Sequence, residues 1–282
     1  FSRDIINLYV HTNNTEIISI VNHMVASVND IFNKHDVSVY IMGSLARGGF
    51  SKIASDIDLG IILKGSLDGA KEKIEIIISE ARKNFPSVKN NISVFWGSIE
   101  SINGVIEGGR YPPFDRLDLI DHALLLSGQD GRERLARPTK KELDIASSRF
   151  SLSYLATQER IEEFHNCSCI AKKGVVYTTK VILFPARFIY GEKTGKIAGN
   201  EESSLYYQNN YKGPDAELIK NGYHWRLNSL PEDLDIVTDY LQKGLPSLYT
   251  NYINIYIQRM EQYEEITLKN KLIQWRNKIL AK

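Results

Sequence analysis

Two aspartates separated by one residue, Asp56 and Asp58, are the side chains best suited to hold a metal ion. They begin an apolar run from Ile57 to Leu63 whose composition is typical of a β-strand. Because side chains alternate between the faces of a strand, both carboxylates project to one side. Two like charges so close together favour a cation between them. Their hard oxygen atoms indicate Mg²⁺, which takes one or two protein carboxylates and completes its shell with water and substrate phosphates.

A Gly-Ser pair follows a second apolar run, Val37 to Met42, upstream of the aspartates. Gly43 allows a tight turn where that strand ends. We expect Ser44 to act as the N-cap of a short helix, which leaves free N–H groups and a hydroxyl for a polyphosphate. A phosphate-binding turn beside a metal site predicts a nucleotidyl-transfer centre.

Gly43-Ser44, the Arg47-Gly48-Gly49 loop and Ser55-Asp56-Ile57-Asp58-Leu59 together resemble the signature of the DNA polymerase β-like nucleotidyltransferase superfamily, in its small stand-alone form. The resemblance implies that Asp56 and Asp58 are catalytic metal ligands. It also implies that Gly43, Ser44 and Arg47 bind the nucleotide, with ATP as the substrate. The alternative is an ordinary turn beside two solvated aspartates, and the joint occurrence of both motifs disfavours it.

The superfamily carries a third carboxylate on the neighbouring strand, often as the general base. Here that strand is expected at Asn91 to Trp96, and its inward positions are Asn91 and Ser93, neither of which can act as a base. Three acids downstream could reach back from a loop: Glu100, Glu107 and Asp115. We take the nearest, Glu100, as the candidate base, with a solvated loop glutamate as the alternative.

A second resemblance lies in the C-terminal half. The stretch Thr194-Gly195-Lys196-Ile197-Ala198 resembles the matching turn of bacterial aminoglycoside adenylyltransferases. In those enzymes a lysine shortly after this turn contacts phosphate. Asn200 stands at that position here, so Lys196 is the expected substitute. Lys180 lies in a basic stripe with Lys173 and Arg187 that either faces the triphosphate or is a solvated helix face.

These patterns predict an α/β (α+β) nucleotidyltransferase domain with a small mixed sheet over residues 1–135. An all-α helical bundle over residues 139–282 follows, and we expect the acceptor to lie in the cleft between the two. In the first domain we expect helices over 15–35, 68–85 and 117–126. In the second we expect helices near 139–165, 170–191, 199–210, 231–244 and 248–279.

Charge, apolar runs and cysteines restrict the partners and the cellular compartment that we expect. The 282 residues carry a formal net charge of +1, which does not favour extensive nucleic-acid binding. No apolar run approaches the roughly 20 residues of a membrane span, and the N-terminus lacks a secretory pattern. Cys167 and Cys169 are too close for an ordinary disulfide, and reduced thiols predict a cytoplasmic protein.

The resemblances therefore imply a metal-dependent adenylyltransferase that moves AMP from ATP to a hydroxyl of an aminoglycoside-like antibiotic, and hence a role in antibiotic resistance. Two alternatives stay open: a toxin-type or regulatory nucleotidyltransferase acting on tRNA or protein, and a degenerate nucleotide-binding module without a catalytic base. Arg160 and His165 match the spacing of HEPN ribonucleases, a motif short enough to arise by chance. A cationic acceptor needs acidic partners, for which the available residues are Glu159, Glu162, Glu163, Glu201 and Glu202. The acceptor, the nucleotide, the base and the oligomeric state are left undetermined.

Overall fold

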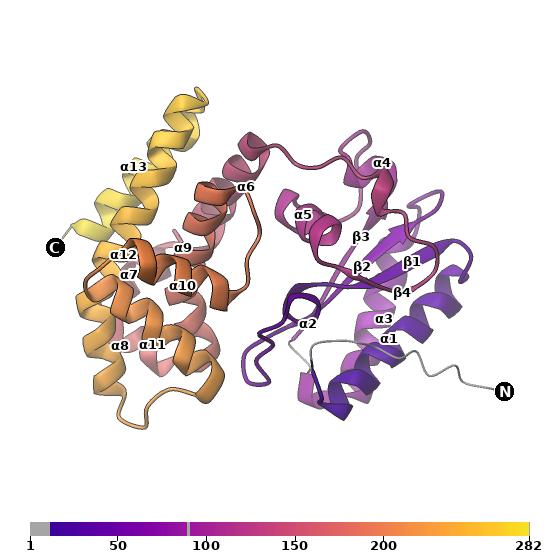
Figure 1. The fold of residues 1–282 in the computed structure, drawn as a ribbon, viewed down its shortest axis with the longest axis horizontal. Helices are drawn as coiled ribbons and strands as arrows, with labels where there is room; N and C mark the ends of the chain where they lie inside the picture. Colours follow the sequence, from indigo (N-terminus) through magenta and orange to yellow (C-terminus); the bar gives the residue numbers. More distant parts are fainter. Residues whose placement is uncertain (1–11, 89–90, 282) are drawn as a thin grey trace. The chain divides into compact units, whose positions relative to one another are not determined.

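The computed structural model describes residues 12–88 and 91–281 of the chain. The chain divides into two compact units: Phe1–Phe50 with Ser55–Pro138, and Ser51–Ala54 with Thr139–Lys282. The first unit contains the sheet and the second is helical (Figure 1). Residues 1–11 of the predicted first domain lie outside the described residues.

The described strands of the first unit form a mixed four-stranded sheet in the order β3-β2-β1-β4. β1 pairs antiparallel with both β2 and β4, whereas β2 and β3 are parallel. The predicted fold class, an α/β (α+β) domain with a small mixed sheet followed by helices, is confirmed. The elements are α1 (Thr15–Phe32), β1 (Val37–Ile41), α2 (Gly43–Arg47), β2 (Ile57–Leu63), α3 (Ala70–Asn84), a 3₁₀ turn (Pro86–Val88), β3 (Ile92–Ser98), α4 (Ile99–Ile102), α5 (Pro113–Asp121), β4 (Leu124–Ser127) and a second 3₁₀ turn (Arg132–Arg134).

Helices α1 and α3 lie side by side against one face of this sheet (Figure 1). The Asn14 side chain caps α1 by accepting hydrogen bonds from the N–H groups of Glu16 and Ile17. The apolar stripe of α1, from Ile17 to Val28, is buried against β-strand side chains such as Leu59. Burial of this stripe holds α1 on the sheet.

The opposite face of the sheet carries Tyr40, Met42 and Phe95, which form a smaller core with Leu119 of α5. In β2, the odd-numbered residues from Ile57 to Leu63 face the core under α1 and α3, whereas Ile62 belongs to the smaller core, so the alternation of the strand puts Asp58 on the same side as α5. The site therefore lies on the face that α5 covers.

The predicted helix over 117–126 is wrong at both ends. Pro113 begins α5 at a position where its missing N–H costs nothing, and the helix ends at Asp121. Leu124–Ser127 instead forms β4 and pairs with the free edge of β1. Leucines 124–126 are compatible with a helix or a strand, and pairing with the unoccupied edge of β1 favours the strand.

The second unit is built from α6 (Lys140–Tyr154), α7 (Gln158–His165), α8 (Cys167–Lys172), α9 (Val175–Thr194), α10 (Asn200–Asn210), α11 (Pro214–Asn228), α12 (Leu234–Gln262) and α13 (Ile266–Leu280). Helix α11 was not predicted, and the predicted break at Pro246 does not occur because α12 runs through it. The predicted first helix is divided by a new N-cap at Thr157. Glu264, with φ of 60°, separates α12 from α13.

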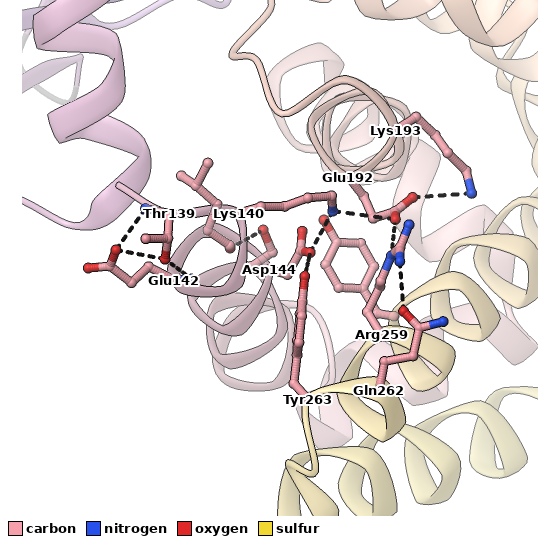
Figure 2. Close-up of polar contacts among 12 residues, drawn as sticks. Thr139, Lys140, Glu142, Asp144, Glu192, Lys193, Arg259, Gln262 and Tyr263 are labelled. Atoms are coloured by element: carbon pink, nitrogen blue, oxygen red, sulfur yellow. Dashed lines mark hydrogen bonds and ion pairs between the residues drawn. The ribbon is translucent and has the colours of Figure 1, made fainter. Parts of the chain in front are cut away.

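A group of charges around the buried carboxylates of Asp144 and Glu192 joins three helices of this unit. Figure 2 shows Lys140 and Asp144 of α6 near Glu192 of α9 and Arg259 of α12. The Glu192 carboxylate is fully buried and pairs with Arg259, with Lys140 at 3.5 Å and with Lys193 at 3.2 Å. Burial opposes ionisation of Glu192, but the hydrogen bond from Arg259 and the lysine charges outweigh it, so its pKa is lowered. This group ties the first helix of the unit to its core.

Candidate active site

The end of β1 brings Gly43 against Asp58. Because β1 and β2 are antiparallel, the start of β2 lies beside the end of β1, and the N–H of Met42 donates to the carbonyl of Asp58 at 2.9 Å. Gly43 has φ of 62°, which favours glycine. A Cβ added there would overlap Asp58 Oδ2 and lie 3.1 Å from Asp58 Cγ. The carboxylate of Asp58 therefore packs directly on the turn predicted to bind phosphate.

Asp56 and Asp58 are half-buried at the start of β2. Both offer hard carboxylate oxygens, and the strand alternation gives them a common side. Within residues 12–88 and 91–281, no three His, Cys, Asp or Glu side chains are grouped to hold a metal ion. The pair fits a Mg²⁺ that takes its other ligands from water and a substrate phosphate.

Helix α2 begins two residues earlier than expected. Met42 is its N-cap and Gly43 its first residue, so Ser44 lies inside the first turn and is not the cap. Arg47 ends the helix, and its side chain is only 12% exposed because it pairs with Asp118. Gly43 thus lies against Asp58, and Ser44 and Arg47 belong to the same short helix, whereas their predicted contacts with a nucleotide stay predictions.

Asp118 on α5 belongs to this site, and sequence analysis missed it. It accepts a hydrogen bond from the N–H of Gly43 at 3.0 Å on Oδ2, and it pairs with Arg47 through Oδ1. A charged residue between Leu117 and Leu119 gives no signal of burial, because aspartate is normally exposed. Only the packing of α5 on the sheet brings it to Gly43.

The position beside Asp58 on β3 carries no acid. The parallel register pairs Asp58 with Ser93 and Ile57 with Ile92. Glu100 lies in α4, which follows the other end of β3. That end of the strand is roughly 15 Å from Ser93. The structure does not bring Glu100 together with Asp56 and Asp58.

Glu100 has partners of its own. Its side chain is 53% exposed and lies 3.9 Å from Arg134. Hydrogen bonds from its own backbone N–H and from the Ser98 hydroxyl lower its pKa. Asp115 lies in the first turn of α5, and its charge adds to the burial that raises the pKa of Tyr111.

The predicted lysines belong to the helical unit. Lys180 is half-buried on α9, and Lys196 is exposed in the turn that follows Gly195. Lys173, from the same predicted stripe, pairs with Glu159 at 2.5 Å and with Glu163. That lysine is therefore already neutralised by two carboxylates within its own unit.

The other motifs of this unit have structural partners. The Arg160 guanidinium lies 4.4 Å from the ring centre of Tyr154 and 4.6 Å from that of Tyr177. His165 instead hydrogen-bonds the carbonyl of Lys278 at 3.1 Å. Four of the five glutamates considered for a cationic acceptor accept hydrogen bonds from side chains of their own unit. They are Glu159, Glu162, Glu163 and Glu202.

Comparisons with known proteins agree with this geometry. Residues 23–104 match the nucleotidyltransferase domain family, and this range contains Gly43, Ser44, Asp56 and Asp58. The predicted relation to the DNA polymerase β-like nucleotidyltransferase superfamily is confirmed. The first unit therefore contains a nucleotidyltransferase domain.

The fold of a larger part of the chain resembles a solved structure, the spectinomycin adenyltransferase AAD(9) from Enterococcus faecialis with ATP and spectinomycin. The TM-score is 0.55 at 15% sequence identity, over 79% of this chain and 97% of that one. At this identity the likeness concerns the fold, and it confirms the predicted resemblance to adenylyltransferases at that level. A comparison with curated protein sequences finds no match. Among the described residues, no helix is both long and apolar enough to cross a membrane.

Proposed function

We propose that this protein transfers AMP from ATP to a hydroxyl group of an aminoglycoside-like antibiotic. The observation that carries the proposal is the packing of the Asp58 carboxylate on Gly43, inside the range that matches the nucleotidyltransferase domain. The similar fold of an adenyltransferase solved with ATP and spectinomycin supports both the nucleotide and the class of acceptor.

In the proposed reaction a hydroxyl oxygen of the acceptor forms a bond to the α-phosphorus of ATP. The bond from that phosphorus to the bridging oxygen of the β-phosphate breaks, and pyrophosphate leaves. Asp56 and Asp58 would hold Mg²⁺, which when bound neutralises negative charge on the phosphates. Gly43, Ser44 and Arg47 would keep the triphosphate in place beside the carboxylates, and we include Lys180 and Lys196 as candidate phosphate contacts.

The hydroxyl proton leaves to a base or to solvent water as the new bond to phosphorus forms. Glu100 is placed away from Asp58, and Ser93 stands where an acid is expected. Asp118 of α5 lies at Gly43, but the Gly43 N–H and Arg47 occupy its two oxygens. The base therefore stays unassigned, and we propose no role for Glu100 in the proton transfer.

The experiment is incubation of the purified protein with Mg²⁺, α-³²P-labelled ATP and a panel of aminoglycosides including spectinomycin. We expect label on one antibiotic and an equal amount of pyrophosphate. Asp58→Asn should abolish both. Asp68→Asn, which changes an exposed aspartate of the same unit, is the matched control and should leave both unchanged. Expression in a sensitive bacterium should raise the inhibitory concentration of the same antibiotic.

A second candidate, a nucleotide-binding module without transferase activity, is favoured by Ser93 beside Asp58. It predicts that Mg-ATP binds while no acceptor yields pyrophosphate. It also predicts that Ser93→Asp, which restores a carboxylate on β3, creates activity where the wild type has none. A silent antibiotic panel with activity on tRNA or protein would instead establish a macromolecular acceptor.

We further propose that the protein acts in the cytoplasm. Cys167 is buried and Cys169 partly exposed, and neither is in a disulfide. Thiols of this kind suit a reducing compartment.

A further inference from the structure

Asp118 is a buried carboxylate to which the proposed reaction assigns no role. It is 5% exposed, and a carboxylate is almost never so buried without a partner. Its two oxygens have different partners: Oδ2 accepts from the N–H of Gly43, and Oδ1 pairs with Arg47. Asp118 thus binds the first and the last residue of α2 at once.

Helix α2 depends on such support because it has only five residues. A helix of this length does not form by itself in water, because the free-energy cost of nucleation exceeds the stabilisation gained from a single hydrogen-bonded turn. Gly43 is also the residue on which the Asp58 carboxylate packs. Whatever holds Gly43 in place therefore also determines where Ser44 lies relative to Asp58.

We propose that Asp118 is a positioning residue of the nucleotide site: acting through Gly43 and Arg47, it holds the Gly43–Arg47 turn against the carboxylate of Asp58. This role rests on the proposed nucleotidyl transfer. Asp118 itself does not take the proton of the acceptor hydroxyl, because Gly43 N–H and Arg47 occupy its two oxygens. It acts on the reaction only through the residues that it places.

The test compares two substitutions on the same helix. Asp118→Asn keeps an oxygen for Gly43 but removes the charge that Arg47 needs. Asp121→Asn removes an aspartate–arginine pair one turn later, where Asp121 pairs with the more exposed Arg137 and has no hydrogen bond to α2. The dissociation constant of Mg-ATP is measured by calorimetry at several Mg²⁺ concentrations, with thermal unfolding of each variant followed by circular dichroism.

We expect Asp118→Asn to raise the dissociation constant about tenfold and to raise the Mg²⁺ concentration needed for tight binding, because a charged hydrogen bond is lost from the turn. Asp121→Asn should change neither by more than about twofold. An Asp118→Asn protein that unfolds earlier but binds Mg-ATP like the wild type would show a merely structural residue and overturn the proposal.

A second variant, Asp118→Glu, covers the case in which Asp118→Asn does not fold, because it keeps the negative charge beside Arg47. It should retain thermal stability while its longer side chain displaces the Gly43–Arg47 turn and lowers the affinity for Mg-ATP, whereas wild-type affinity in a folded Asp118→Glu protein would overturn the positioning role. If the wild type binds no Mg-ATP, the proposed function fails and the positioning role fails with it. Wild-type binding that every Asp118 variant retains refutes the positioning role alone.

Discussion

Substitution of Gly43 by alanine tests the proposed site most directly, because Gly43 combines a positive φ with a close contact to Asp58. The added Cβ would overlap Asp58 Oδ2 and lie 3.1 Å from its Cγ, so the carboxylate has to move by about 1 Å to restore an ordinary contact. A misplacement of that size in a catalytic group costs about 100-fold in rate. The positive φ adds about 1–2 kcal/mol of backbone strain.

Gly49 offers a matched control in the same loop. Its φ is 75°, but a Cβ at Gly49 meets no atom within 4 Å. Gly49→Ala therefore carries a similar backbone strain without displacing any side chain. We expect both variants to lose about 1–2 kcal/mol of stability, and only Gly43→Ala to lose activity.

The assay measures pyrophosphate release with the acceptor identified in the panel, together with thermal unfolding of both variants. We expect kcat/KM to fall about 100-fold in Gly43→Ala and to change less than about threefold in Gly49→Ala. Equal activity of the two variants would refute the reasoning, since the position of the Asp58 carboxylate would then not matter to the reaction. Equal losses would point to strain in the loop as the cause.

Three further predictions concern stability. Glu192→Gln should lower the free energy of unfolding by about 2–4 kcal/mol, because Arg259 loses its buried, charged partner. Urea denaturation measures this change, and a decrease in unfolding free energy smaller than that of a surface substitution would contradict it. A hydrogen bond from Arg132 lowers the pKa of Asp130 to about 2, below its usual 3.8, so its stabilisation is present above about pH 4 and is lost as the pH falls toward 2. Asp130→Asn should therefore lower stability at pH 6 but not at pH 2, and an equal loss at both values contradicts this. Arg160→Ala should lower the free energy of unfolding by about 1–2 kcal/mol, because the cation–π contact with Tyr154 is lost. Neither the wild type nor this variant should cleave RNA measurably.

The helical unit shows where sequence reasoning fails. Pro246 predicts a break because proline lacks an N–H and clashes with the preceding turn. Helix α12 nevertheless continues through it, and the residues that follow, such as Leu248 and Tyr249, are fully buried in the core. Burial of that long apolar face outweighs the loss of one hydrogen bond. A real break occurs at Glu264, where the sequence contains neither glycine nor proline.

The local half of the site could be predicted from sequence. A strand with alternating side chains gives Asp56 and Asp58 a common side, and Gly43 ends the preceding strand in a turn that favours glycine. These features depend on the geometry of residues that are close in the chain. The superfamily could therefore be recognised from about 30 residues, and residues 23–104 confirm it.

The remaining half was decided by tertiary structure. The parallel register of β2 and β3 places Ser93 beside Asp58 and puts Glu100 at the far end of the sheet, so nearness in sequence was a poor guide to nearness in space. The packing of α5 brings Asp118 across 75 residues of chain to the N–H of Gly43. The alternation of a strand is a property of the strand itself. Which buried charge meets which turn depends on how separate elements share one core, and no local pattern in the sequence encodes that.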